Sequence, residues 1–282
     1  PANSSDGSFS PAIEDSVGLD VIAVGYSEKV GEEEIYIYVK SVPPKVIKKE
    51  RLIKNIPVNY VRMGKVEVRP ETSSSSNPAG NCYIENDKIA CGSSCAPSGQ
   101  NYSGTFGAIT KSKIDGAYYA LSNNHVFASC NHLERDMPIL SPSTLDVTPA
   151  SAAPLAIFRH YDIIEFHSGN PVMVEKNEVD AAIAKVIDNS KISSQQGFFF
   201  DTPITSISPQ VGMKVKKVGR TTGLTSGTIE SKTVTLKLPY KSKNFTAVSY
   251  FKECWFIKPD SSHPFASPGD SGSLVVDETE NH

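Results

Sequence analysis

From about Tyr102 onward, the chain is a series of short β-branched segments separated by turn residues. Examples are GAYYALSNNHVFA, YDIIEF, VDAAIAKVI, LTSGTIE and GSLVVD, and few stretches show a helical period. Short strands at regular spacing between Gly, Pro and Asn are typical of an all-β sandwich or barrel. The sequence therefore predicts a mostly β protein.

The part of the chain before these strands is organised differently. Residues 1–16 are polar and are predicted to form a flexible tail, while residues 17–70 are predicted to form a small α/β unit. In that unit, PPKVIKKERLIK predicts a short helix after its prolines. Residues 71–100 contain four consecutive serines flanked by Pro, Gly and Asn, which predicts a linker.

Composition excludes several classes of function. The chain has 28 Lys and Arg against 31 Asp and Glu, a formal charge of −3, and no basic stripe, so no nucleic-acid partner is expected. No apolar run approaches the ~18 residues of a membrane-spanning helix. The start of the chain lacks the features of a signal peptide, although a secreted chain with its signal removed would look the same.

Five cysteines are too few for a disulfide scaffold. Cys82, Cys91 and Cys95 cluster, while Cys130 and Cys254 stand alone. No fourth ligand lies near the cluster at metal spacing, so the residues leave a metal site, a local disulfide and free thiols as alternatives. We predict neither a metal nor a cofactor.

The stretch PGDSGSL, which begins at Pro268, is a candidate nucleophile turn. A serine hydroxyl attacks a carbonyl only when it is exposed beside a base and near donors for the developing oxyanion. Gly269 allows a tight turn in which its own N–H and that of Ser271 point the same way, and Gly272 leaves the approach open. A Gly/Ser-rich hairpin turn is the alternative interpretation.

A base and an orienting acid are found in two other apolar segments. His125 follows an apolar strand in ALSNNHVFA, so its ring is expected to be fixed. Asp180 interrupts the apolar run VDAAIA, where a carboxylate is costly unless it is paired, and an imidazole N–H is a suitable partner. Asp162 in YDIIEF competes for this role, but Asp180 has the more completely apolar setting. The pair would fix the histidine tautomer that serves as a base.

The order His125, Asp180, Ser271 and the segments LSNNHVFA, VDAAIA and PGDSGSLV resemble the chymotrypsin/trypsin-like serine proteases of the PA clan. The resemblance implies two six-stranded β-barrels with the catalytic cleft between them, residues 101–195 forming the first and 196–282 the second. It further implies a serine endopeptidase acting on a protein or peptide. A regulatory or scaffold protein with a latent or relic protease fold is the alternative.

Within this family, VGRTTGLTSGTIE is similar to a segment of secreted bacterial enzymes. Taken with the N-terminal unit, the motifs look most like the intracellular trypsin-like proteins of bacteria, which are related to the plant narrow-leaf-type proteases. That resemblance implies a cytoplasmic protein. Some bacterial members are encoded beside defence effectors, which implies activation of a partner by cleavage.

The resemblance also implies roles for four further residues. Arg220 would neutralise Asp270 in the oxyanion turn, with a solvated turn residue as the alternative for Arg220. Phe265 and His263 would lie near the substrate pocket, or His263 on a surface loop. The family continues beyond the strand GSLVVD, so the second barrel is expected to be incomplete in this chain. We expect the further strands either as a second chain, produced by a cut that the enzyme itself is a candidate for making, or as residues outside this sequence.

Overall fold

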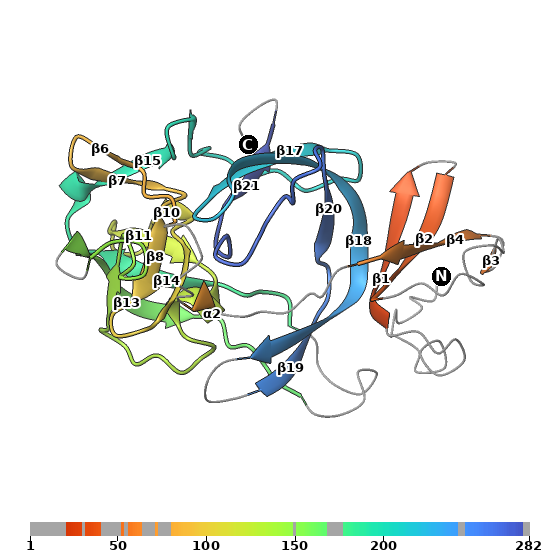
Figure 1. Ribbon diagram of the computed structural model, residues 1–282, viewed down its shortest axis with the longest axis horizontal. Helices are drawn as coiled ribbons and strands as arrows, with labels where there is room; N and C mark the ends of the chain where they lie inside the picture. The colour runs from red at the N-terminus through yellow and green to blue at the C-terminus, as the bar shows by residue number, and fades with distance from the viewer. Residues whose placement is uncertain are drawn as a thin grey trace.

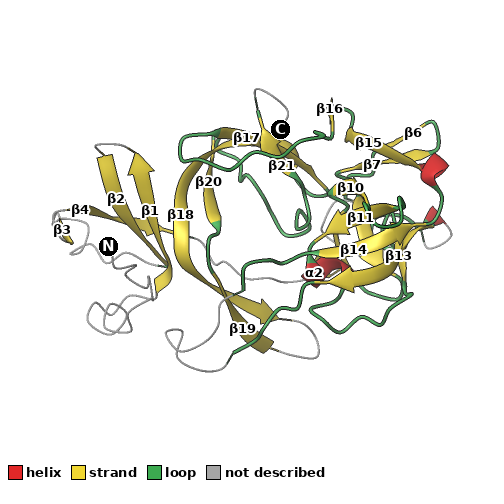
Figure 2. Ribbon diagram, turned by 180° about the vertical axis from the view of Figure 1, so that it is seen from behind, coloured by secondary structure: helices red, strands yellow, loops and turns green. Residues whose placement is uncertain are grey.

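The computed structural model of the protein describes residues 21–29, 32–40, 52–53, 56–63, 71–72, 80–148, 151–167, 177–241 and 246–278. Strands dominate these residues, and the helices are single turns such as α2 (Asn124–Phe127) and η2 (Asn189–Lys191). Two large sheets and one small sheet result (Figures 1 and 2). The predicted mostly β fold class is confirmed. None of the helices in the described ranges could span a membrane.

The first large sheet has the order β10-β11-β14-β13-β12-β8-β9-β5. Its strands are β5 (Glu71–Thr72), β8 (Ser94–Pro97), β9 (Tyr102–Thr105), β10 (Ala108–Lys111), β11 (Tyr118–Ser122), β12 (Pro138–Leu140), β13 (Pro154–Tyr161) and β14 (Ala182–Val186). In the antiparallel pairing of β11 with β14, Ser122 lies opposite Ala182. This register brings the end of β11, which leads into α2, beside the start of β14.

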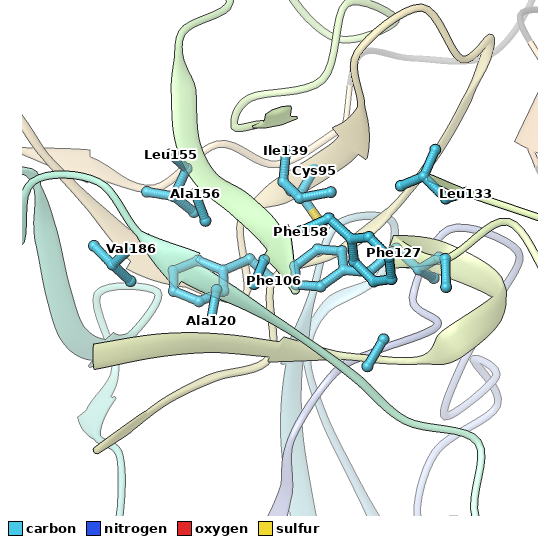
Figure 3. Close-up of a cluster of buried hydrophobic side chains, with 14 of the residues drawn as sticks. Cys95, Phe106, Ala120, Phe127, Leu133, Ile139, Leu155, Ala156, Phe158 and Val186 are labelled. Atoms are coloured by element: carbon cyan, nitrogen blue, oxygen red, sulfur yellow. The ribbon is translucent and has the colours of Figure 1, made fainter. Parts of the chain in front are cut away.

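The core of this sheet anchors α2. Phe106, Phe127, Phe158 and Ile139 are fully buried in one cluster (Figure 3). Each such side chain contributes on the order of 1.5–3 kcal/mol relative to exposure. Because Phe127 belongs to α2, the short helix is fixed to the sheet by packing, not by its own few hydrogen bonds.

The second large sheet has the order β21-β17-β18-β1-β2-β4-β3, and β19 and β20 also pair with β18. Its strands are β1 (Val21–Lys29), β2 (Glu32–Val39), β3 (Leu52–Ile53), β4 (Ile56–Arg62), β17 (Lys214–Gly219), β18 (Gly223–Lys241), β19 (Thr246–Phe251), β20 (Trp255–Pro259) and β21 (Val275–Asp277). The 19-residue β18 curls through the sheet and pairs with different strands along its length. β21 ends the sheet order, directly after the candidate nucleophile turn.

The described strands of the N-terminal unit extend the second sheet. Val24 of β1 lies opposite Thr235 of β18, and the Tyr38 ring stacks on Phe256 with centroids 3.9 Å apart. Most of the predicted helix at residues 43–54 lies outside the described residues, and its Leu52–Ile53 pair forms β3. The unit is thus joined to the C-terminal strands of the chain by backbone pairing.

The third sheet has the order β16-β15-β7-β6. Its strands are β6 (Ile84–Glu85), β7 (Lys88–Cys91), β15 (Ile192–Gln196) and β16 (Phe200–Asp201). The predicted linker over residues 71–100 is wrong for its second half, because β6, β7 and β8 lie there. Cys91 and Cys95 are fully buried in the first core, which holds this segment in place. The four serines lie outside the described residues.

Candidate active site

His125 lies on α2, immediately after β11. Val126 and Phe127, which follow His125, are buried in the core of the first sheet and fix the backbone there. The His125 side chain is only 10% exposed. The ring therefore has a defined orientation, as an apolar setting predicts.

The carboxylate that meets the His125 ring is Asp180. Nδ1 of His125 lies 2.6 Å from Oδ2 of Asp180, and the His125 backbone N–H donates to Oδ1 at 3.3 Å. The Asn123 side chain donates a hydrogen bond to the Asp180 carbonyl at 2.7 Å and so fixes the backbone of Asp180. A carboxylate on Nδ1 holds the proton there and leaves Nε2 as the basic nitrogen. Nε2 is buried and has no hydrogen-bond partner among the described residues.

Asp162, the alternative candidate for the orienting acid, lies in a different environment. Its residue is exposed, and its backbone carbonyl accepts a hydrogen bond from the Asn124 side chain at 2.7 Å. Asp162 thus contributes a main-chain contact beside α2, while its carboxylate belongs to the surface.

The candidate nucleophile turn packs against β9. The Thr105 N–H donates to the Ser271 carbonyl at 2.8 Å, and the Thr105 hydroxyl donates to the Gly269 carbonyl at 2.9 Å. Gly269 and Gly272 have φ values of 96° and 95°, which favour glycine. A side chain on Gly272 would also collide with the Thr105 carbonyl at 2.4 Å. The turn therefore requires both glycines.

The turn and α2 both lie beside Gly104 of β9. A side chain placed on Gly104 would come within 2.6 Å of Val126 and 3.2 Å of the Ser271 carbonyl oxygen. The structure thus brings the serine turn, from the second sheet, close to the helix that carries His125. Ser271 is partly exposed.

Asp270 lies inside the turn and is almost fully buried. One carboxylate oxygen accepts the N–H groups of Thr221 and Thr222 at 2.8 and 3.1 Å. The other accepts the Thr222 hydroxyl at 2.7 Å and the Ser267 N–H at 2.9 Å. Lys217 Nζ lies 3.5 Å from this second oxygen, and both side chains are 1% exposed. Burial lowers the pKa of Lys217, and Asp270 partly offsets that shift.

The prediction that Arg220 forms an ion pair with Asp270 is wrong. The Arg220 guanidinium instead binds Asp146, with Nε 3.0 Å from Oδ2 and Nη2 2.5 Å from Oδ1. The physical reason is the direction of the Arg220 side chain, which runs past Gly80, where any added Cβ would lie 2.2 Å from Nε. The cation beside Asp270 is therefore Lys217.

The two predicted pocket residues differ in setting. His263 is exposed on the loop that precedes the turn. Phe265 is half-buried, its ring lies 3.1 Å from the Cβ position of Gly227, and its carbonyl accepts the Thr225 hydroxyl at 2.8 Å. Lys217 Nζ lies 5.9 Å from the centre of the Phe265 ring.

Sequence reasoning missed Lys217, Asp146 and Thr105. The alternation in MKVKKVG could have indicated Lys217, because it shares a strand face with the buried Val215. Asp146 gave no such signal, since STLDVTP resembles an ordinary surface turn. The position of Thr105 opposite the serine turn follows only from tertiary pairing.

The described residues contain no group of three His, Cys, Asp or Glu side chains that could hold a metal ion. All five cysteines are free thiols in the structure. Free thiols are one of the three alternatives that the sequence left open.

Residues 173–282 match the model of the Nal1 C-terminal domain family. No curated protein matches the chain. Among solved structures, the chain is similar to a glutamic acid-specific serine protease, with 18% identity, coverage of 66% of this chain and 79% of that chain, and a TM-score of 0.38. It is also similar to protease A of Thermobifida fusca, with 13% identity, 66% and 77% coverage, and a TM-score of 0.38. A third is the chymotrypsin of Cellulomonas bogoriensis, with 14% identity, 67% and 76% coverage, and a TM-score of 0.36.

Proposed function

We propose that this protein is a serine endopeptidase that hydrolyses peptide bonds through an acyl-enzyme. The observation that carries the proposal is the 2.6 Å contact between His125 and Asp180 beside a glycine-flanked serine turn. This combination supplies a base of defined tautomer, its orienting acid and a partly exposed hydroxyl. Those three roles define serine-type acyl transfer on unrelated folds.

In the proposed reaction, the Ser271 hydroxyl attacks the peptide carbonyl and its proton passes to Nε2 of His125. The resulting oxyanion is held by the N–H groups of Gly269 and Ser271, which Asp270 and Thr105 keep in place by fixing the turn. His125 then protonates the leaving amine. A water molecule, deprotonated by His125, releases the acyl group and regenerates the serine.

The substrate is proposed to be a protein or peptide, with Phe265 and His263 near its binding site. In line with the family resemblance, we propose a cytoplasmic protein that activates a partner by limited cleavage, with a secreted mature chain as the alternative. Self-cleavage and a second chain that supplies further strands of the second barrel belong to the same proposal.

A latent or relic protease with a regulatory or scaffold role is the second candidate. It is favoured by the burial of His125 Nε2, which has no hydrogen-bond partner among the described residues. In a latent form, a partner or a cut would bring Nε2 and the Ser271 hydroxyl into contact.

The two candidates are separated by incubating the protein with a peptide library and sequencing the products by mass spectrometry. A protease yields cleavage that Ser271→Ala and His125→Ala abolish and that Ser206→Ala, at an exposed loop position, leaves intact. Cleavage that persists in Ser271→Ala overturns the proposal. Absence of cleavage in every variant favours the latent or relic form.

A further inference from the structure

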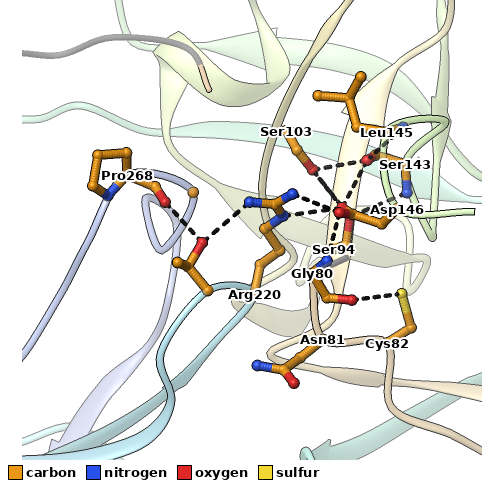
Figure 4. A network of polar contacts seen from close by, with 12 residues as sticks. Gly80, Asn81, Cys82, Ser94, Ser103, Ser143, Leu145, Asp146, Arg220 and Pro268 are labelled. Carbon is orange, nitrogen blue, oxygen red and sulfur yellow. Dashed lines mark hydrogen bonds and ion pairs between the residues drawn. The ribbon is translucent and has the colours of Figure 1, made fainter. Parts of the chain in front are cut away.

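Asp146 is the centre of a buried polar cluster between the two large sheets (Figure 4). It lies in the loop between β12 and β13, and its side chain is 0% exposed. Oδ2 accepts hydrogen bonds from the hydroxyls of Ser94, Ser103 and Ser143, the latter two at 3.0 Å. Oδ1 accepts the N–H of Gly80 at 2.6 Å. Two strands of the first sheet, the loop after β12 and the Gly80 backbone together hold this one carboxylate.

A cationic side chain that follows a strand of the second sheet balances the negative charge of Asp146. Arg220 follows β17, and its guanidinium, 5% exposed, binds both carboxylate oxygens in a fork. An arginine fork on a carboxylate fixes direction as well as distance. Since Asp146 is itself held by the three serines, the position of the guanidinium is set by the first sheet.

Two chains of hydrogen bonds lead from Arg220 to the candidate nucleophile turn. Nη1 donates to the Thr221 hydroxyl at 3.2 Å, and that hydroxyl donates to the Pro268 carbonyl at 2.7 Å. The backbone N–H of Arg220 donates to the Thr105 hydroxyl at 3.0 Å, which donates to the Gly269 carbonyl at 2.9 Å. Figure 4 shows Arg220 between Asp146 and Pro268.

These contacts act on the peptide planes before the serine. The carbonyl of Pro268 shares its peptide plane with the N–H of Gly269, one of the two proposed oxyanion donors. A hydrogen bond that holds this carbonyl therefore also holds the direction of that N–H. The Thr221 N–H, on the same Arg220 turn, additionally holds Asp270 at 2.8 Å.

We propose that Asp146 is a positioning residue for the oxyanion turn, acting through Arg220, Thr221 and Thr105. Through these contacts, the direction of the Gly269 N–H depends on how the first and second large sheets pack together. This inference rests on the proposed function for its catalytic consequence. The coupling between Asp146 and the turn can be measured without any activity.

Three variants break the connection at different points. Asp146→Asn removes the charge at the centre. Gly80→Ala keeps both charges and crowds the Arg220 side chain, because its Cβ would lie 2.2 Å from Nε. Thr221→Val, at an exposed position, removes the hydroxyl that links Arg220 to Pro268, and Thr221→Ser restores it. Arg159→Gln is the matched control, since it breaks an exposed ion pair with Asp136 in the first sheet.

The first measurement is hydrogen–deuterium exchange of the Pro268–Ser273 segment by mass spectrometry. We expect faster exchange in Asp146→Asn, Gly80→Ala and Thr221→Val, and wild-type exchange in Thr221→Ser and Arg159→Gln. The second is the rate of labelling by a fluorophosphonate. We expect a fall of roughly two- to tenfold for Thr221→Val, corresponding to one net hydrogen bond, and rescue by Thr221→Ser.

The outcomes separate this inference from the proposed function. If the folded variants keep wild-type exchange in Pro268–Ser273, Asp146 has only a structural role and the inference fails. If Asp146→Asn does not fold, Gly80→Ala and Thr221→Val decide by the same criterion. If the wild-type protein does not react with the fluorophosphonate, the proposed function is in question, while the exchange result still decides the coupling.

Discussion

The ammonium of Lys217 lies 3.5 Å from a carboxylate oxygen of Asp270, and each side chain is 1% exposed. The pair lies directly beneath the turn that carries Ser271. A buried charge is tolerated only when it is paired and hydrogen-bonded, and Asp270 accepts four further hydrogen bonds. The conformation of the serine turn therefore depends on a lysine of β17.

Replacement of Lys217 by Met is expected to destabilise the protein by about 3–5 kcal/mol, because Asp270 would remain buried without its cation. Urea unfolding followed by circular dichroism measures the change. The double variant Lys217→Met with Asp270→Asn should recover part of the loss, since no charge is then left unpaired. Equal stability of Lys217→Met and the wild type would refute the role of the ion pair.

The buried Asp146 carboxylate is expected to make the free energy of unfolding depend on pH. Burial opposes ionisation, but Arg220, Ser94 and Gly80 outweigh it and lower the Asp146 pKa from 3.8 to about 2. A lowered carboxyl pKa gives stability that is fully present above about pH 4 and is lost as the pH falls through about 2. The loss should be about 2 kcal/mol.

This dependence is measured as the free energy of unfolding at pH 5 and at pH 2. The difference should be smaller by about 2 kcal/mol in Asp146→Asn than in the wild type. Asp136→Asn, at an exposed ion pair, is the control and should follow the wild type. Identical acid profiles of Asp146→Asn and the wild type would contradict the assigned pKa shift.

The orienting acid is tested by comparing Asp180→Asn with Asp162→Asn. The first is expected to lower turnover about 10⁴-fold, because the amide would favour the wrong His125 tautomer. The second should leave turnover close to wild type, since the Asp162 contact to Asn124 uses the backbone carbonyl. Initial rates on a cleaved peptide provide the comparison. The reverse order would transfer the orienting role to Asp162.

Gly272→Ala is expected to disrupt the serine turn. Both Gly272 and Gly116 have positive φ, 95° and 70°, so alanine at either position is strained by roughly 1–2 kcal/mol. Only at Gly272 would the new Cβ meet backbone, the Thr105 carbonyl at 2.4 Å, whereas at Gly116 it would meet open space. Thermal unfolding should show the larger loss for Gly272→Ala. Equal losses would mean that the turn can relax away from β9.

Much of this arrangement could be predicted from local patterns. The apolar settings of His125 and Asp180 indicated fixed polar groups, and the glycines around Ser271 indicated a tight turn. Both features depend on residues within a few positions of the side chains concerned, so a short stretch of sequence is enough to predict them.

The partners across the sheets could not be predicted in this way. Arg220 was expected on Asp270, but the side chain turns to Asp146, which lies 74 residues earlier in the chain. Likewise, nothing in the N-terminal segment indicates that Val24 lies opposite Thr235. Such contacts are set by how the sheets pack against each other. A short stretch of sequence contains no information on which distant segment it will contact.

The site of covalent modification by a fluorophosphonate tests the proposed role of Ser271 most directly. The protein is labelled, digested and mapped by tandem mass spectrometry, with Ser271→Ala and His125→Ala in parallel. We expect one adduct, on Ser271, which is absent in Ser271→Ala and forms far more slowly in His125→Ala. An adduct on another serine, or labelling at Ser271 that is independent of His125, would contradict that role.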